Sequence, residues 1–122
     1  MIKMSITGVG AVMTLLQSKK GNVDSEVKTA LGKIGLHMQN EVKESISGHR
    51  SEPTSVDTGH LMRNVFFQTG KKEVAIFTHV SYANIVENST RIKGGPRRHF
   101  QNSLNRNKAK IKEIVEGQIN NI

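Results

Sequence analysis

The spacing of apolar residues in the first half of the chain predicts a short strand followed by a long helix. Between Ile2 and Ile6, apolar and polar residues alternate, which is typical of a half-buried strand. Apolar residues then recur every three or four positions and line one face of a helix that ends before Gly48. They are Val23, Val27, Ala30, Leu31, Ile34, Met38, Val42 and Ile46. Gly32 and Gly35 each weaken a helix by about 1 kcal/mol relative to Ala, so we expect close packing against them.

The second half of the chain predicts a hairpin. Val65–Thr69 and Glu73–Val80 have the composition of strands and are separated by a turn that begins at Gly70. The second strand carries apolar residues on both of its faces. We therefore expect one face to pack on the long helix and the other to meet a partner.

Two helical segments are predicted after the hairpin. The first is short, and its apolar side is formed by Tyr82, Ile85 and Val86. A basic loop that contains Gly and Pro separates it from a terminal helix, in which helical spacing extends from Phe100 to Ile119.

These segments together predict an α+β fold. A small, mostly antiparallel sheet is expected to pack against one long N-terminal helix and a C-terminal helix. The chain shows no internal repeat and no linker, so we expect a single domain over residues 1–122. Two polar loops, near residues 48–58 and 90–99, are expected to be mobile.

Composition narrows the possible chemistry. The chain has no Cys, which excludes disulfides, thiolate catalysis and Cys-ligated zinc. No run approaches the roughly 18 apolar residues of a membrane span, and no convincing signal peptide is present, so we expect a soluble protein made in the cytoplasm. Eighteen basic residues against ten acidic ones give a net charge of +8.

Much of the positive charge is concentrated in one stretch. Between Thr90 and Lys112 there are eight basic residues and no acidic one. They are Arg91, Lys93, Arg97, Arg98, Arg106, Lys108, Lys110 and Lys112. The stretch is either the solvated face of a helix or a surface that attracts an anionic partner. It lacks interleaved aromatic residues, so base stacking by this segment is not supported, whereas non-specific phosphate contact stays open.

The tripeptide Asp57-Thr58-Gly59 matches the form in which aspartic proteases present their catalytic carboxylate. Here it follows a polar loop and a long helix, without the apolar strand or the flap of a protease. A structural function fits better, with Asp57 or Thr58 capping the next segment and Gly59 permitting a turn. We therefore expect no catalytic residue in this tripeptide.

Metal and cofactor sites are not expected. The five His residues have no paired spacing of four and no acidic neighbours in a ligand pattern. Gly8 and Gly10 follow a strand, but a third Gly and a nucleotide-binding βαβ unit are missing. We expect no cofactor, no metal ion and no enzyme activity.

Three stretches resemble the tail-completion, or head–tail joining, family of long-tailed bacteriophages. The matching stretches are PTSVDTGHLMRNV (53–65), VSYANIVENST (80–90) and PRRHFQNSL (96–104). The family pattern has V-D-T-G-x-L-R-x-S after a Pro, then a hairpin, then Y-A-x-x-V-E-x-G-T and A-R-P-F-L-x-x-A-L. Here Ser89 replaces the usual Gly, and Arg98-His99-Phe100 replaces R-P-F. The residues that carry the pattern are Asp57, Thr58, Gly59, Leu61, Tyr82, Glu87 and Phe100.

The resemblance implies a structural virion protein, made in the host bacterial cytoplasm, that joins the phage head or neck to the tail. It implies a ring of six copies around the path of the DNA, fitted between neck and tail proteins; in solution the chain could also be a monomer. No membrane partner is implied. The basic segment could face DNA in the lumen or dock on an acidic neighbouring ring, through Arg91, Lys93, Arg97, Arg98, Lys108 and Lys112.

Two other classes of protein remain open. The chain could be a small basic protein that binds nucleic acid without sequence preference, or a regulator such as one partner of a toxin–antitoxin pair. The basic segment is compatible with the first of these, and no motif distinguishes the second.

Overall fold

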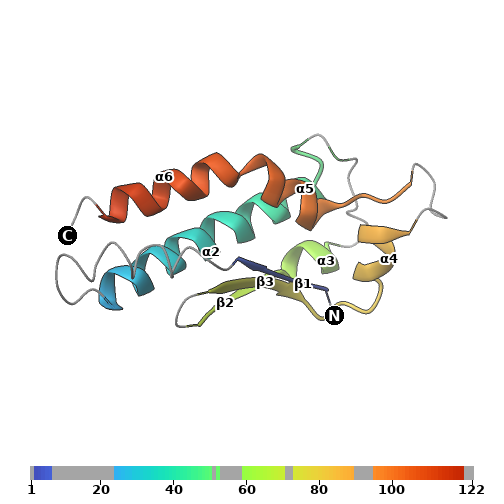
Figure 1. The fold of residues 1–122 in the computed structure, drawn as a ribbon. Helices are drawn as coiled ribbons and strands as arrows, with labels where there is room; N and C mark the ends of the chain where they lie inside the picture. Colours follow the sequence, from blue (N-terminus) through green and yellow to red (C-terminus); the bar gives the residue numbers. More distant parts are fainter. Residues whose placement is uncertain are drawn as a thin grey trace.

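A computed structural model describes residues 2–6, 24–50, 52, 59–70, 73–89 and 95–119 of the chain. The elements in chain order are β1 (Ile2–Ile6), α2 (Asp24–Ile46), α3 (His60–Arg63), β2 (Phe66–Thr69), β3 (Val74–Thr78), α4 (Ala83–Asn88), α5 (His99–Arg106) and α6 (Lys108–Ile119). The predicted α+β fold is confirmed, with the sheet on the long helix and the terminal helices beside it (Figure 1).

The sheet is antiparallel, and its strand order is β1-β3-β2. β1 pairs with β3 so that Met4 lies opposite Ile76, and β2 pairs with β3 so that Phe67 also lies opposite Ile76. Since side chains alternate between the faces of a sheet, this row points to one face and the rows on either side point to the other. The predicted strand at Ile2–Ile6 and the predicted hairpin are both confirmed.

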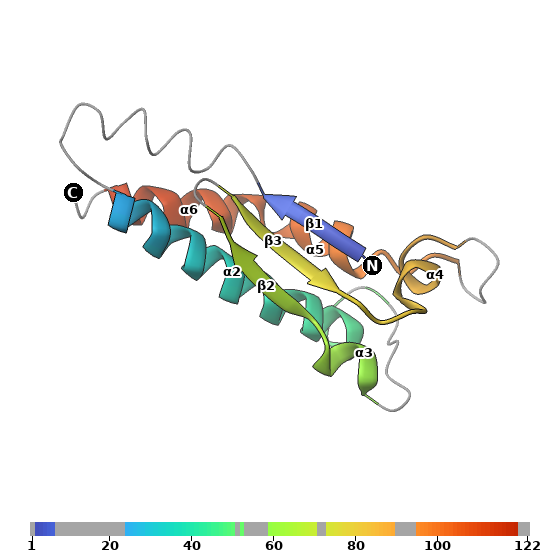
Figure 2. The same cartoon turned by 90° about the horizontal axis from the view of Figure 1, so that it is seen from below.

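Helix α2 covers one face of the sheet, and α5 and α6 run along α2 on the side away from the sheet (Figure 1). The face turned to the viewer in Figure 2 has no described helix over it. The apolar stripe predicted for α2 is buried wherever its residues are described, and with β3 it forms the core. Fully buried core residues include Leu31, Ile34, Met38, Val42, Ile46, Val74 and Ile76.

The end of α2 explains the position of Gly48. The backbone N–H of Gly48 donates to the carbonyl oxygen of Ser45 at 3.2 Å, and that of His49 donates to Glu44 at 2.9 Å. This pair of bonds is the Schellman motif, which needs a left-handed residue after the helix. Gly48 has φ 87°, so the expected glycine cap is confirmed.

The two glycines inside α2 behave differently. A Cβ built on Gly35 would overlap the ring of Phe67, so this ring of β2 lies directly against the backbone of α2. Close packing is confirmed there. The same expectation for Gly32 is wrong, because a Cβ at Gly32 would meet nothing within 4 Å in the described part of the chain.

The predicted single terminal helix is in fact two helices, α5 and α6, that meet at Asn107. The Asn107 side chain donates to the carbonyl oxygen of Ser103 at 2.7 Å, and its Oδ1 lies 2.9 Å from Nε2 of His37. Asn side chains compete in this way with the helical backbone, which interrupts the helix. Apolar spacing alone does not reveal such a break.

The predicted apolar side of α4 is confirmed for Val86, which packs against the core, and is wrong for Tyr82 and Ile85. Ala83 and Glu87 are buried, Val86 is partly buried, and Tyr82 and Ile85 are 40% and 54% exposed. The helix is rotated so that it turns Glu87 inward, because that carboxylate is used by the next helix. Among the described helices, none is long and apolar enough to cross a membrane.

Candidate partner interface

The buried carboxylate of Glu87 holds the beginning of α5. It accepts hydrogen bonds from the backbone N–H groups of Phe100 and Gln101, each at 3.0 Å. These are first-turn N–H groups, which have no partner inside their own helix. The negative charge also interacts favourably with the positive end of the helix dipole.

The chain that leads into α5 is held against α4 as well. The backbone N–H of Arg97 donates to the carbonyl oxygen of Val86 at 2.9 Å, and that of Arg98 donates to Glu87 at 3.2 Å. Arg98 itself has φ 51° and ψ 40°, a left-handed conformation that is uncommon for a residue other than Gly. Two of the three stretches that resemble the phage family, 80–90 and 96–104, are therefore bonded to each other.

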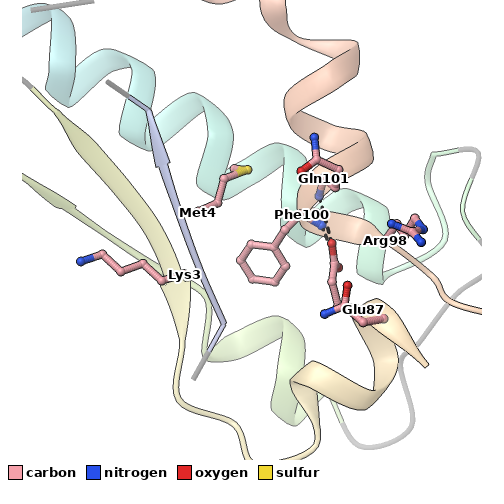
Figure 3. A pocket seen from close by; sticks show the side chains of 7 residues that line it. Lys3, Met4, Glu87, Arg98, Phe100 and Gln101 are labelled. Carbon is pink, nitrogen blue, oxygen red and sulfur yellow. Dashed lines mark hydrogen bonds between the residues drawn. The ribbon is translucent and has the colours of Figure 1, made fainter. Parts of the chain in front are cut away.

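A pocket of about 350 Å³ lies between β1, the end of α4 and the start of α5. Met4 and Phe100 lie on facing sides of it, and the Glu87 carboxylate closes the side next to α5 (Figure 3). Lys3 and Arg98 extend from the pocket in opposite directions (Figure 3). The pocket is thus lined by two apolar side chains, the amide residues Asn88 and Gln101, and a carboxylate whose oxygens already accept hydrogen bonds, while Lys3 and Arg98 lie at its margins.

The structure divides the predicted basic segment into two parts. Arg97 and Arg98 lie at the start of α5, and Lys108 and Lys112 lie on α6, roughly 15–22 Å further along at 1.5 Å per residue. Arg91 and Lys93 lie outside the described residues. The six predicted contact residues therefore do not form one compact cluster.

Acidic residues from outside the segment also reduce its charge. Glu52 binds Arg106 at 2.7 Å, Glu113 lies 3.4 Å from Lys110, and Glu116 lies 3.9 Å from Lys112. The last two pairs are exposed, so each contributes little to stability. Arg97 directs Nη1 to the carbonyl oxygen of Gly95 at 3.0 Å, and Arg98 is exposed. Among the described residues of the segment, Arg97, Arg98 and Lys108 have no salt bridge to a carboxylate, and two of these three cations lie together at the start of α5.

The Asp57-Thr58-Gly59 motif is described only in part, because Asp57 and Thr58 lie outside the described residues. Gly59 precedes α3 and has φ 80°, a conformation that favours Gly. A Cβ at this position would also lie 2.6 Å from Nη1 of Arg63. Leu61 is 3% exposed and belongs to the core, so α3 is held by an apolar anchor.

A buried polar cluster that the sequence did not reveal joins three separate segments. The hydroxyl of Ser45 on α2 donates to Oε1 of Glu52 at 2.5 Å and lies 2.8 Å from Nδ1 of His99 on α5. The other carboxylate oxygen of Glu52 accepts hydrogen bonds from Arg106 at 2.7 Å and from Asn102 at 3.2 Å. Since the one hydroxyl proton goes to the carboxylate, Nδ1 of His99 donates to the Ser45 oxygen.

Burial determines the protonation state of His99 in this cluster. His99 is 1% exposed, and its burial lowers its pKa from 6.5 to about 4, although the charge of Glu52 acts in the opposite direction. Ser45 is fully buried, so this Ser–His–Glu set does not present a nucleophile to a substrate. The described residues contain no group of three His, Asp or Glu that could hold a metal ion. We assign the cluster a structural role.

Comparisons with known proteins return no match: no protein-family model, no curated protein and no solved structure is similar to the chain. A proposed function must therefore rest on the residues and their geometry.

Proposed function

We propose that the chain is a structural component of a phage virion that joins the head or neck to the tail, as a ring around the DNA channel. The observation that carries the proposal is the bond between two of the three resembling stretches, in which Glu87 caps the helix that begins near Phe100. Glu87 and Phe100 are pattern residues of the resemblance, and this contact gives them a common physical purpose. It supports the proposal because residues that depend on each other are expected to recur together.

We assign the exposed cations at the start of α5 to a neighbouring protein in this assembly. A phosphate backbone presents negative charge continuously and favours a continuous row of cations. The basic segment is instead divided, and three of its cations already face Glu52, Glu113 or Glu116. Arg97 and Arg98 therefore suit a local acidic patch on a neighbouring ring better than a DNA duplex.

The joining function is tested in particles that lack the chain. Electron microscopy should show full heads beside unattached tails, and the wild-type chain supplied separately should restore complete particles. Attached tails in its absence would contradict the proposed function.

The proposed docking residues, Arg97 and Arg98, are tested by charge-reversal variants in the same complementation experiment. Arg97→Glu combined with Arg98→Glu should block joining, whereas Lys28→Glu combined with Lys110→Glu, which changes the net charge equally, should not. If both double variants join heads to tails normally, Arg97 and Arg98 are not the docking residues. If the purified wild-type chain binds duplex DNA tightly at physiological salt, DNA rather than a protein ring is the target.

A further inference from the structure

The face of the sheet that α2 does not cover carries two aromatic residues in one cross-strand row. Phe77 of β3 lies opposite Phe66 of β2 on one side and opposite Lys3 of β1 on the other. The two Phe rings are 6.1 Å apart and tilted by 43°, and the ring of His79 lies edge-on to Phe77 at 5.4 Å. Phe66 lies on the edge strand β2 and is 43% exposed, so its ring is accessible to a ligand.

Most of the residues around this pair are polar or basic, and Ala75 and Val80 are the apolar ones. The next row on the same face is Ser5, Ala75 and Gln68, and a hollow of about 160 Å³ beside Phe66 is lined by Asn64, His79 and Val80. Glu73 precedes β3 at the far end of the face, four residues from Phe77 and thus roughly 13 Å away along the strand. Exposed rings with a cation and amide side chains beside them are suited to stacking on bases and to phosphate contact.

The size of the face also argues for a narrow ligand. Three strands of four or five residues cover roughly 200 Å² at ordinary strand spacings. A single strand of nucleic acid suits a face this narrow, because it stacks its bases one by one on single rings. The net charge of +8 attracts a polyanion and disfavours a second copy of the chain on this face.

We propose that this open sheet face, which we call the Phe66–Phe77 face, binds single-stranded DNA by stacking bases on the two rings while Lys3 contacts phosphate. We choose DNA for the test, and RNA is one of its outcomes, because Ser5, Gln68 and Asn64 offer oxygen acceptors to a ribose 2′-hydroxyl beside the rings. This site is separate from the start of α5, and the inference goes beyond the joining function.

The test is fluorescence polarisation with a fluorescein-labelled oligothymidine of about twelve nucleotides, within the site size of small single-strand binders. The protein is titrated to about 100 μM in low salt, the weak end of non-specific nucleic-acid affinity. Phe66→Ala should weaken binding about 5- to 150-fold, the range that corresponds to loss of one stacked base. Phe66→Trp should retain binding, because it keeps a stacking surface.

Two matched variants test whether the loss of any exposed apolar side chain weakens binding. Leu36→Ala and Ile85→Ala also remove exposed apolar side chains, but from α2 and α4, and should leave binding unchanged. Phe66 is exposed, so its replacement should leave the protein folded, and a urea melt checks this.

Several results would overturn the inference. They are no binding of the oligothymidine in this range, equal binding by wild type and Phe66→Ala, or tighter binding of a duplex of the same length. Preference for oligouridine over oligothymidine would overturn the choice of DNA. If sedimentation shows that wild type self-associates through this face and Phe66→Ala does not, the face is a protein interface instead.

Discussion

At the scale of single residues, the most informative contact is made by Glu87. Both of its carboxylate oxygens accept backbone hydrogen bonds from the start of α5, and its side chain is buried. Hydrogen bonds to an ionised acceptor are roughly twice as strong as neutral ones, and a buried N–H that loses its acceptor is costly. One side chain therefore couples two segments of the chain.

We predict that Glu87→Gln lowers the free energy of unfolding by about 1–3 kcal/mol. Gln keeps the shape and one acceptor oxygen, but it loses the charge and leaves one N–H of α5 without its acceptor. Urea denaturation measures the loss. The matched variant Glu116→Gln, on the exposed part of α6, should change stability by less than about 0.5 kcal/mol. Equal losses in the two variants would show that the carboxylate of Glu87 has no special role.

At the scale of elements, α2 packs against other parts of the fold on two of its faces. Its apolar stripe packs on the sheet, while polar residues spaced four apart face the terminal helices. Lys33 donates to Gln118 at 3.0 Å, His37 lies 2.9 Å from Asn107, and Ser45 joins the His99 cluster. Residues four apart lie on one side of a helix, so this series forms a polar seam between α2 and α5–α6.

The two glycines of α2 provide a matched test of its packing. Gly35→Ala should destabilise the protein by about 1–3 kcal/mol, because its Cβ would overlap the Phe67 ring. Gly32→Ala meets nothing within 4 Å in the described part of the chain and removes the helix cost of Gly, so it should stabilise by up to about 1 kcal/mol. Thermal melts of both variants check the signs. Stabilisation by both would mean that Phe67 does not lie against the helix.

At the scale of the whole molecule, the cluster around His99 connects parts that are far apart in the sequence. Ser45 comes from α2, Glu52 from the segment after it, and His99 and Arg106 from α5. Its burial makes the stability of the whole fold depend on pH, because His99 must stay neutral in the folded protein.

We predict that acidification destabilises the protein between pH 6.5 and about 4. In this window the unfolded chain binds a proton at His99 that the folded protein does not bind, so the free energy of unfolding falls as pH falls. The full loss is roughly 3 kcal/mol, reached near pH 4. Urea melts across the window should show a smaller decline in His99→Asn. The variant His79→Gln, at an exposed position, should decline like the wild type. A decline of the same size in His99→Asn would assign the acid sensitivity to other groups.

The elements that depend on local periodicity could be predicted from the residues alone. Alternation at Ile2–Ile6, the stripe of α2 and the hairpin after Val65 each repeat over several residues, and burial of one face follows from that repeat. Gly48 was also predictable, because a helix end that turns left-handed requires a particular residue. The resemblance identified Glu87 and Phe100 as pattern residues. It did not predict that Glu87 caps the helix that contains Phe100.

Contacts between residues that are distant in the sequence emerged only from the folded chain. Glu52 and Arg106 are separated by 54 positions, as are Ser45 and His99, and no spacing rule connects them. Helix α4 turns Glu87 inward because the first turn of α5 requires an acceptor for its backbone N–H groups. The break at Asn107 follows from the contacts of its side chain with Ser103 and His37. Phe66 and Phe77 share an open face because the register places them there, although their sequence pattern also suits a buried sheet. A hydrogen bond is short-ranged and requires a partner at one position, whereas burial requires only that one face of an element is apolar. The sequence pattern therefore predicted the core but not the buried polar clusters.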